Sequence, residues 1–482
     1  MRCREFGAAS WSTDPESSCL LDGAVGTVSF KARDGLFLEI PFGSLSHLDG
    51  VPRVHSGAGE LKRAYGRCQS GEFITLIDLF NSSRSYNGHG FTKESWRARE
   101  ALVSHDGFFA GDPTVTSAEV SIDGLFEWVR DSPVKGGRRY SADGKWLSMT
   151  YSVSSDSLRE TVIYRCDTSE VLLSPRVVDG GGNLPLKSYS LSGDQVLVFR
   201  FAPPYPRLRD AMFNVILPFR DLLSLLMGYR AEILEASFKS PEADDDIKYY
   251  APLVETASEN RPNRWLREMP FPYHSAEASL QLAVERWFSL DPDARRASRV
   301  ILGFLIGRSN PNLSSEFVTL ASAFEALTRV GQKTQELAGE EFERRLACIE
   351  QSVSDKKARD WAKRKLKYAN SVPAGTLADK MLRELEPFTS WLVPDVGKFK
   401  SDHRASRNAY VHRSERLDSE ACLDDADLLT HTDATFLLAY VKILNLLGWP
   451  TSELVERFKD SYYRSYKVCL IQRMYANKGG LS

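Results

Sequence analysis

The feature that most constrains this chain is a change in its hydrophobic pattern near residue 205. Before that point, short runs rich in Val, Ile, Phe and Thr are separated by Gly, Asp, Asn and Ser clusters, which is typical of strands joined by tight turns. The clearest runs are 27–42, 71–80, 159–166 and 194–201. After FAPPYPRLRD at 201–210, a proline-rich stretch typical of a hinge, apolar residues recur at helical spacing. The predicted fold class is therefore α+β, a β-rich N-terminal domain followed by an all-α helical bundle.

The chain is also long enough for more than one domain, at 482 residues. We divide it into a β-rich domain over 1–205, a helical connecting region over 206–290 and a helical domain over 291–482. The formal net charge of −2 gives no general attraction to nucleic acid. Any contact with nucleic acid must therefore come from a local basic patch.

The cysteines and the apolar segments predict where such a chain resides. Its seven cysteines are widely spaced and form no CxxC pair, which argues against a disulfide framework and a zinc site. The N-terminal residues contain no apolar signal segment. The most apolar stretch, 212–229, is interrupted by Pro218, Arg220 and Asp221, so it predicts a buried helix and not a membrane span. We expect a cytoplasmic protein without membrane contact, metal or cofactor.

A helix is predicted over 314–330, with Ser314 or Ser315 as its N-cap. Its apolar stripe, spaced for one helix face, is Phe317, Leu320, Phe324 and Leu327. Glu325 lies about 80° from the centre of that stripe, at the edge of the buried face. Its carboxylate is then either half in water at an interface or the partner of an arginine.

A basic run, KKARDWAKRKLK, occupies 356–367 and holds seven basic residues and one Trp. Charge runs of this kind are usually solvated helix faces. The functional alternative is a patch for the RNA backbone, with Lys363, Arg364 and Lys365 as contacts.

The segment 401–415, SDHRASRNAYVHRSE, places Arg407, Asn408 and His412 in the short motif RNAYVH. An Arg and a His at this spacing often occur by chance, but here they lie between long apolar helices. In a helix over 403–416, Asn408 and His412 share a face, whereas Arg407 lies about 140° around the axis from His412. The two groups converge only if the helix starts irregularly or if two such helices meet across a dimer. The alternative is that Arg407 pairs with an acidic neighbour and His412 is a surface residue.

The order of these parts resembles the ApeA-like family of bacterial anti-phage proteins. A β-rich N-terminal half leads into helices that read LQLAVERWFSL, LGFLIGRS and FVTLASAFEAL, and then SRNAYVHR precedes a last apolar helix at 424–450. In this family a β-rich domain precedes a HEPN helical bundle, and HEPN ribonucleases carry Arg, four to six residues and His. The helix order and motif cover most of 275–450, whereas over 20–250 the likeness rests on β-rich character, position and length.

The resemblance implies a metal-independent endoribonuclease of abortive-infection defence, which uses the substrate's 2′-OH and leaves a 2′,3′-cyclic phosphate. Its expected target is RNA, with the tRNA anticodon loop favoured. It also implies a homodimer through the HEPN domain, with the N-terminal domain sensing a phage-derived trigger. The implied catalytic residues are Arg407, His412, Asn408 and Glu325. His403, Arg404 and Arg413 are each either an auxiliary phosphate contact or a plain solvated surface residue.

Two alternatives stay open from the sequence. In the first, the HEPN domain is catalytically inactive and binds RNA or protein, or only dimerises. In the second, the β-rich domain holds the main activity and binds carbohydrate or protein.

Overall fold

The computed structural model describes most of the chain as two compact units. The first comprises 1–223, 231–266 and 272–281, and the second 224–230, 267–271 and 282–482. The described residues are 3–15, 23–31, 35–45, 60–86, 92–140, 143, 146–183, 188–252, 269–305, 312–366, 369–412, 423–460 and 462–476.

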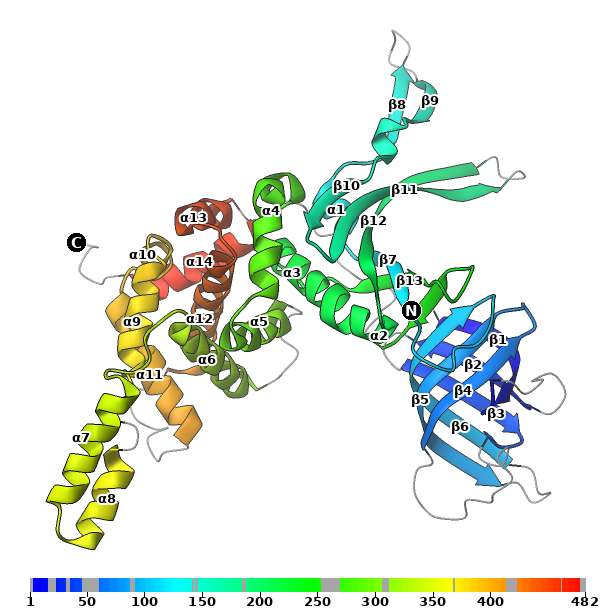
Figure 1. Ribbon diagram of the computed structural model, residues 1–482. Coiled ribbons are helices and arrows are strands. Elements are labelled where there is room, and N and C mark those ends of the chain that lie inside the picture. Colours follow the sequence, from blue (N-terminus) through cyan, green and yellow to red (C-terminus); the bar gives the residue numbers. More distant parts are fainter. Residues whose placement is uncertain are drawn as a thin grey trace. The chain divides into compact units, whose positions relative to one another are not determined.

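Six strands at the N-terminus close into an antiparallel barrel (Figure 1). They are β1 (Cys3–Ser12), β2 (Ala24–Lys31), β3 (Gly35–Phe42), β4 (Glu60–Cys68), β5 (Phe73–Tyr86) and β6 (Thr92–Ser104). The order is β6-β3-β2-β1-β4-β5, and β5 pairs with β6 to complete the ring. Closure leaves no free edge among these six strands apart from their ends.

Alternating side chains fill the barrel, as the period of a strand requires. Trp11 and Trp96 are fully buried at its centre, together with Ile74 and Leu76. Gly66 lies where a Cβ atom would come within 2.6 Å of the Trp11 ring, so only glycine lets the strand approach that ring.

The sheet continues from the barrel into a second group of strands. These are β7 (Val115–Ile122), β10 (Thr161–Arg165), β11 (Ser169–Asn183), β12 (Ser188–Tyr205), β13 (Ile233–Lys239) and β14 (Ile247–Tyr250). A separate hairpin is formed by β8 (Val134–Tyr140) and β9 (Trp146–Val153). Helical segments in this part are α1 (Leu125–Val129), a short 3-10 turn (Asp156–Leu158), α2 (Leu208–Ala211), a π turn (Met212–Ile216) and α3 (Leu217–Met227).

The region 206–290 differs from the helical connection expected of it. It contains α2, α3 and all of α4 (Tyr273–Phe288), but also the strands β13 and β14. Strand β13 pairs with β7, and β14 pairs with β6 of the barrel. The strands form because these short amphipathic segments complete a sheet whose other strands lie far away in the sequence, which local periodicity does not show.

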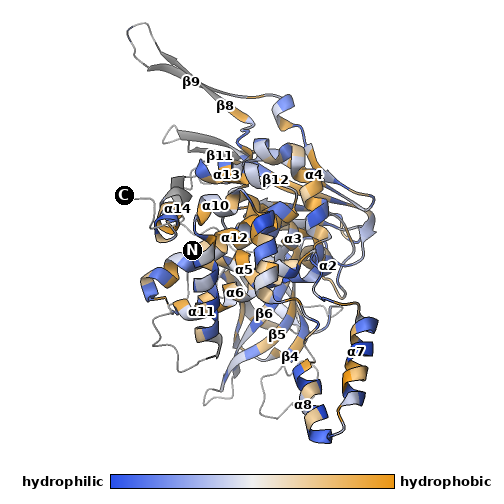
Figure 2. Cartoon of the chain, turned by 90° about the vertical axis from the view of Figure 1, so that its left-hand side faces the viewer, coloured by the Kyte–Doolittle hydropathy of each residue, from blue (hydrophilic) through white to orange (hydrophobic). Residues whose placement is uncertain are grey.

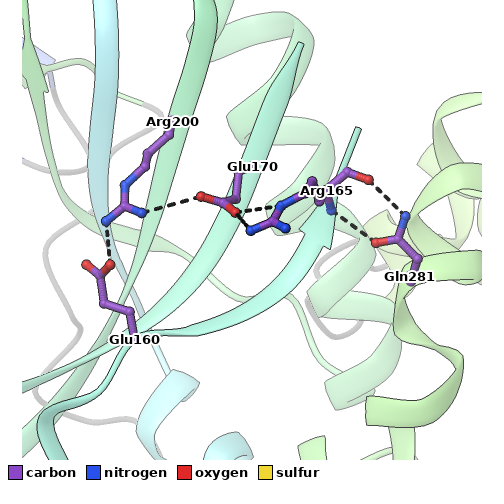
Figure 3. Close-up of polar contacts among 5 residues, drawn as sticks. All are labelled: Glu160, Arg165, Glu170, Arg200 and Gln281. Carbon is purple, nitrogen blue, oxygen red and sulfur yellow. Dashed lines mark hydrogen bonds and ion pairs between the residues drawn. The ribbon is translucent and has the colours of Figure 1, made fainter. Parts of the chain in front are cut away.

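A polar network joins the outer strands of this sheet to the middle of α4 (Figure 3). Glu170 accepts from Arg165 at 2.8 Å and from Arg200 at 3.3 Å, and Arg200 also pairs with Glu160. Hydrogen bonds from Arg165 hold the pKa of Glu170 below its usual value. Gln281 of α4 makes two backbone hydrogen bonds of 3.0 Å to Arg165. The network therefore fastens the middle of α4 to β10.

The second unit is helical (Figure 1). Its helices are α5 (Pro292–Leu305), α6 (Leu313–Arg329), α7 (Gly339–Ser352), α8 (Lys356–Leu366), α9 (Ala374–Glu384), α10 (Phe388–Leu392), α11 (Val396–His412), α12 (Asp425–Leu446), α13 (Thr451–Lys459) and α14 (Tyr462–Met474). The α12 helix is buried along most of its length and packs against α5, α6 and α14. The predicted fold class, a β-rich region followed by an all-α bundle, is confirmed.

The predicted apolar stripe of α6 is also confirmed, since Phe317, Leu320, Phe324 and Leu327 are all buried. The predicted N-cap was wrong by two or three residues. Asn312 caps the helix, and its side chain accepts from the backbone N–H of Ser315 at 3.1 Å. Among the described residues, no helix combines the length and the apolarity needed to cross a membrane.

Candidate functional site

Helix α6 presents Glu325 at the edge of its buried face. The apolar stripe fixes the rotation of the helix, because each stripe residue is packed against the core. Glu325 is half-buried, with 27% of its side chain exposed. A carboxylate in this position needs a partner, and α11 supplies one.

The partner is Arg407, which binds Glu325 through two parallel contacts. Its Nε lies 2.6 Å from Oε1, and its Nη2 donates to Oε2 at 3.0 Å. This is the two-pronged geometry that a guanidinium and a carboxylate form best. The pair ties α11 to α6, and it leaves the Nη1 hydrogens and one Nη2 hydrogen of Arg407 free of Glu325.

A groove of about 630 Å³ opens beside this pair, between α6, α9 and α11. Its volume falls within the usual range for ligand pockets, about 300–1,000 Å³. Its lining includes Glu325 of α6, Gly375 of α9 and Arg404, Arg407 and Asn408 of α11. The structure thus brings Glu325, Arg407, Asn408 and Arg404 to one place.

His403 was predicted as a phosphate contact, and this prediction was wrong. Its ring packs among Phe317, Phe324 and Phe399, with ring centroids 5.1–5.9 Å apart. Its Nδ1 lies 3.2 Å from Nε2 of His431, and its Nε2 is buried without a hydrogen-bond partner. Although His403 contributes to the groove lining, both of its nitrogens face the core. Apolar residues of α6 and α11 close around the ring, which a charge-rich sequence context does not reveal.

Two short polar contacts connect His403 to Tyr475. Nδ1 of His403 lies 3.2 Å from Nε2 of His431, and Nδ1 of His431 lies 2.6 Å from the Tyr475 hydroxyl. Each contact is within hydrogen-bond distance, so His403, His431 and Tyr475 form one buried polar chain. Burial and the nearby charge of Arg407 lower the pKa of His403 to about 4. Burial, followed by His403 and Lys398, lowers the pKa of His431 well below its usual value.

His412 is the last residue of α11, and its side chain lies outside what the structure describes. Arg413 lies outside the described residues. The helix is continuous from Val396 to His412. An irregular helix start therefore does not bring Arg407 and His412 together within one chain. Arg407 and His412 are therefore about 140° apart around one helix axis.

Lys363, Arg364 and Lys365 lie away from the groove, on α8, and all three are exposed. Lys363 pairs with Glu350 of α7 at 3.1 Å. Neither α7 nor α8 has a buried residue, and the two helices extend together from the other helices of their unit (Figure 1). Figure 2 shows hydrophilic residues along much of α8 and at the end of this hairpin. Trp361 is 58% exposed in the middle of α8.

Comparison with protein families identifies both halves of the chain. A family model described as ApeA N-terminal domain 1 matches residues 11–287, more than half of the chain, and one described as Apea-like HEPN matches residues 318–453. The chain belongs to the ApeA-like family. Its HEPN match includes Glu325, Arg407, Asn408 and His412. No curated protein and no solved structure matches the chain.

Sequence reasoning missed several residues of the HEPN site. His431 and Tyr475 were not singled out, although His431 lies three residues after buried Leu428 on the same face of α12. The part of α9 that lines the groove was also missed. The sequence signal for it is weak, namely the small residues Gly375 and Ala378 at helical spacing. Within the part of the chain that the structure describes, no three His, Cys, Asp or Glu side chains are grouped to hold a metal ion.

The lowered pKa of His403 predicts a specific pH dependence of HEPN stability. Because the unfolded histidine titrates near 6.5 and the folded one near 4, the unfolded chain binds more protons between these values. This contribution to stability is therefore complete above pH 6.5 and is lost as the pH falls toward 4. From pH 7.5 to pH 5, the free energy of unfolding should fall in both proteins. In His403→Phe it should fall by about 1–2 kcal/mol less than in wild type.

Urea titrations of the full chain at the two pH values measure this difference. His274→Phe is the matched control, because His274 is exposed and should leave the pH dependence unchanged. Parallel pH profiles for wild type and His403→Phe would show that the folded His403 titrates normally.

Proposed function

We propose that this ApeA-like protein is a metal-independent endoribonuclease of bacterial anti-phage defence, acting in the cytoplasm by abortive infection. The observation that carries the proposal is the two-pronged Glu325–Arg407 pair beside an open groove, one residue before Asn408 and on the helix that ends in His412. The expected target is unpaired RNA, whose backbone can adopt the in-line geometry for attack. The tRNA anticodon loop is the case that the family resemblance favours.

In the proposed reaction the 2′-OH attacks the adjacent phosphorus and the P–O5′ bond breaks. The products are a 2′,3′-cyclic phosphate and a 5′-hydroxyl. His412 accepts the proton of the 2′-OH or protonates the departing 5′-oxygen. Arg407 binds the non-bridging oxygens, on which charge grows in the transition state. Asn408 orients the histidine or bonds the phosphate.

Glu325 has a positioning role in this proposal. Its carboxylate accepts hydrogen bonds from the Nε–H and one Nη2–H of Arg407. This fixes the orientation of the donors that remain. Glu325 also offsets part of the charge of Arg407, so a second cation beside the pair would strengthen the attraction for phosphate. Arg404 suits this role, because it is exposed at the groove and no carboxylate of the described residues pairs with it.

A dimer completes the proposed site, since one continuous α11 separates Arg407 from His412. Arg407 of one copy would then work beside the histidine of a second copy. The N-terminal domain is proposed to restrain the ribonuclease until it meets a phage-derived trigger.

The first prediction is that purified protein cuts total tRNA in EDTA, with a phage lysate added in parallel. His412→Ala should reduce cutting by about 100-fold or more, the usual scale for loss of a general acid or base. The new ends are mapped for 2′,3′-cyclic phosphate. Equal cutting by both proteins would place the activity elsewhere. RNA binding without cuts, with and without lysate, would favour the inactive binding module.

The second prediction concerns Glu325→Gln. A glutamine cannot accept both Arg407 hydrogens through its two terminal atoms, so the guanidinium loses its fixed direction. We expect kcat for tRNA cleavage to fall by about tenfold, while KM does not rise, because the variant gains positive charge. Glu341→Gln is the matched control, since both carboxylate oxygens of Glu341 also accept from arginine, here from Arg344 and Arg345 on α7. An unchanged kcat in Glu325→Gln would remove the positioning role.

The third prediction is that Lys363, Arg364 and Lys365 touch the RNA backbone. Changing all three to Glu should weaken RNA binding and flatten the slope of log affinity against log salt by about 0.7 for each single-strand phosphate that the variant no longer neutralises. The measurement is a binding titration between 50 and 200 mM salt, roughly the range over which phosphate contacts dominate affinity.

A second triple variant controls for overall charge. Lys333, Arg383 and Lys459 are also exposed but scattered over the same unit, and changing them to Glu alters the net charge equally. An identical weakening in both triple variants would mean that the run on α8 acts only through bulk charge.

A further inference from the structure

The groove beside Arg407 has two chemically different parts. Its interior is apolar, with Phe324 from α6, Leu382 from α9 and Phe399 from α11. Its polar lining on α11 includes Lys400 and Arg404. A ligand that fits both parts has a flat or apolar body joined to an anionic group.

Small residues of α9 keep the groove open. Ala374, Gly375 and Ala378 line it, and a Cβ atom built on Gly375 would meet no atom within 4 Å. The space is therefore not already filled by neighbouring side chains. Since Gly375 lies in a helix with ordinary backbone angles, a larger residue there adds volume without backbone strain.

The charges of the groove are mostly paired, with one exception. Arg407 binds Glu325, and Lys400 binds Asp379 at 2.7 Å. Arg404 is exposed and has no carboxylate partner among the described residues. The groove thus carries one uncompensated cation, placed where an anion attached to the ligand would lie.

Two uncharged polar side chains on α11 face the same space. Ser401 and Asn408 line the groove, are exposed and lie seven residues apart, two turns along one helix face. A carboxamide offers both a donor and an acceptor, and a hydroxyl offers either. These groups match the mixed donor and acceptor edge of a nucleobase.

We propose that the groove binds a single unpaired nucleobase of the RNA, next to the bond that is cut, and so selects the cleavage position. The base enters between the phenylalanines and the small residues of α9, its edge meets either Asn408 or Ser401, and its phosphate meets Arg404. Proteins that read unpaired RNA bind splayed bases by stacking and by hydrogen bonds to their edges. This inference rests on the proposed ribonuclease function, because it names the substrate contact of that same site.

Filling the groove tests the inference. Gly375→Leu adds a side chain to the α9 wall, whereas Thr376→Leu makes the same kind of addition at the next, exposed residue, which does not line the groove. Wild type should cut a pool of unstructured RNA, randomised at its centre, with one base enriched beside the cut. Gly375→Leu should lose this enrichment and cut about tenfold or more slowly, the scale of a single base stack. Thr376→Leu should behave as wild type.

A binding measurement separates failure of the inference from failure of the proposed function. In the His412→Ala background, affinities are measured for 12-nucleotide oligo(A), oligo(C) and oligo(U) and for a 12-residue abasic RNA of equal charge. At least one base-bearing RNA should bind more tightly than the abasic one, and Gly375→Leu should erase the difference.

Each outcome then has one meaning. Cutting by wild type with the same base enrichment in Gly375→Leu overturns the base site and leaves the ribonuclease proposal standing. Absence of cutting together with a base preference that Gly375→Leu removes overturns the ribonuclease and keeps the base site. Equal affinity for base-bearing and abasic RNA overturns the base site.

Discussion

The arrangement of the HEPN site depends on one ion pair, between Glu325 of α6 and Arg407 of α11. The pair joins two residues that are 82 positions apart in sequence, and its two parallel contacts fix the guanidinium in direction as well as in place. Both side chains are partly exposed, with 34% and 27% remaining, so the pair contributes little to stability. Its consequence lies in geometry, because it decides which donors of Arg407 reach the groove.

The arginine of this pair also lies one helical turn from the buried His403. A buried imidazole one helical turn from an arginine is held neutral, both by its apolar neighbours and by that positive charge. The neutral ring then forms part of the polar chain through His431 to Tyr475. This chain ties α11 to α12 and to Tyr475, the residue after α14. The helix that carries Arg407 is thus held by a buried polar chain whose histidines are costly to charge at neutral pH.

Local patterns were enough to predict some of this arrangement and not the rest. The rotation of α6 follows from its apolar stripe, so the edge position of Glu325 could be read from spacing alone. The burial of His403 could not, because it depends on Phe317 and Phe324 of another helix. Strand β13 was missed for the same reason, since ILEASFK becomes a strand by pairing with β7. The groove is formed by α6, α9 and α11 together. The small residues that keep it open give almost no recognisable pattern in the sequence.

The geometry of α11 also limits how the site can be assembled. Arg407 and His412 are separated by about 7.5 Å along the helix axis and about 140° around it. Arg407 is committed to the groove side by Glu325, so the His412 backbone lies on a different side of the helix from the phosphate that Arg407 would bind. A second copy related by a two-fold axis would bring its own His412 toward that phosphate, and it would form two equivalent sites at once. Under this arrangement an isolated chain holds only half of each site. Control over pairing would then be control over cleavage, which a cell that carries a ribonuclease against its own RNA requires.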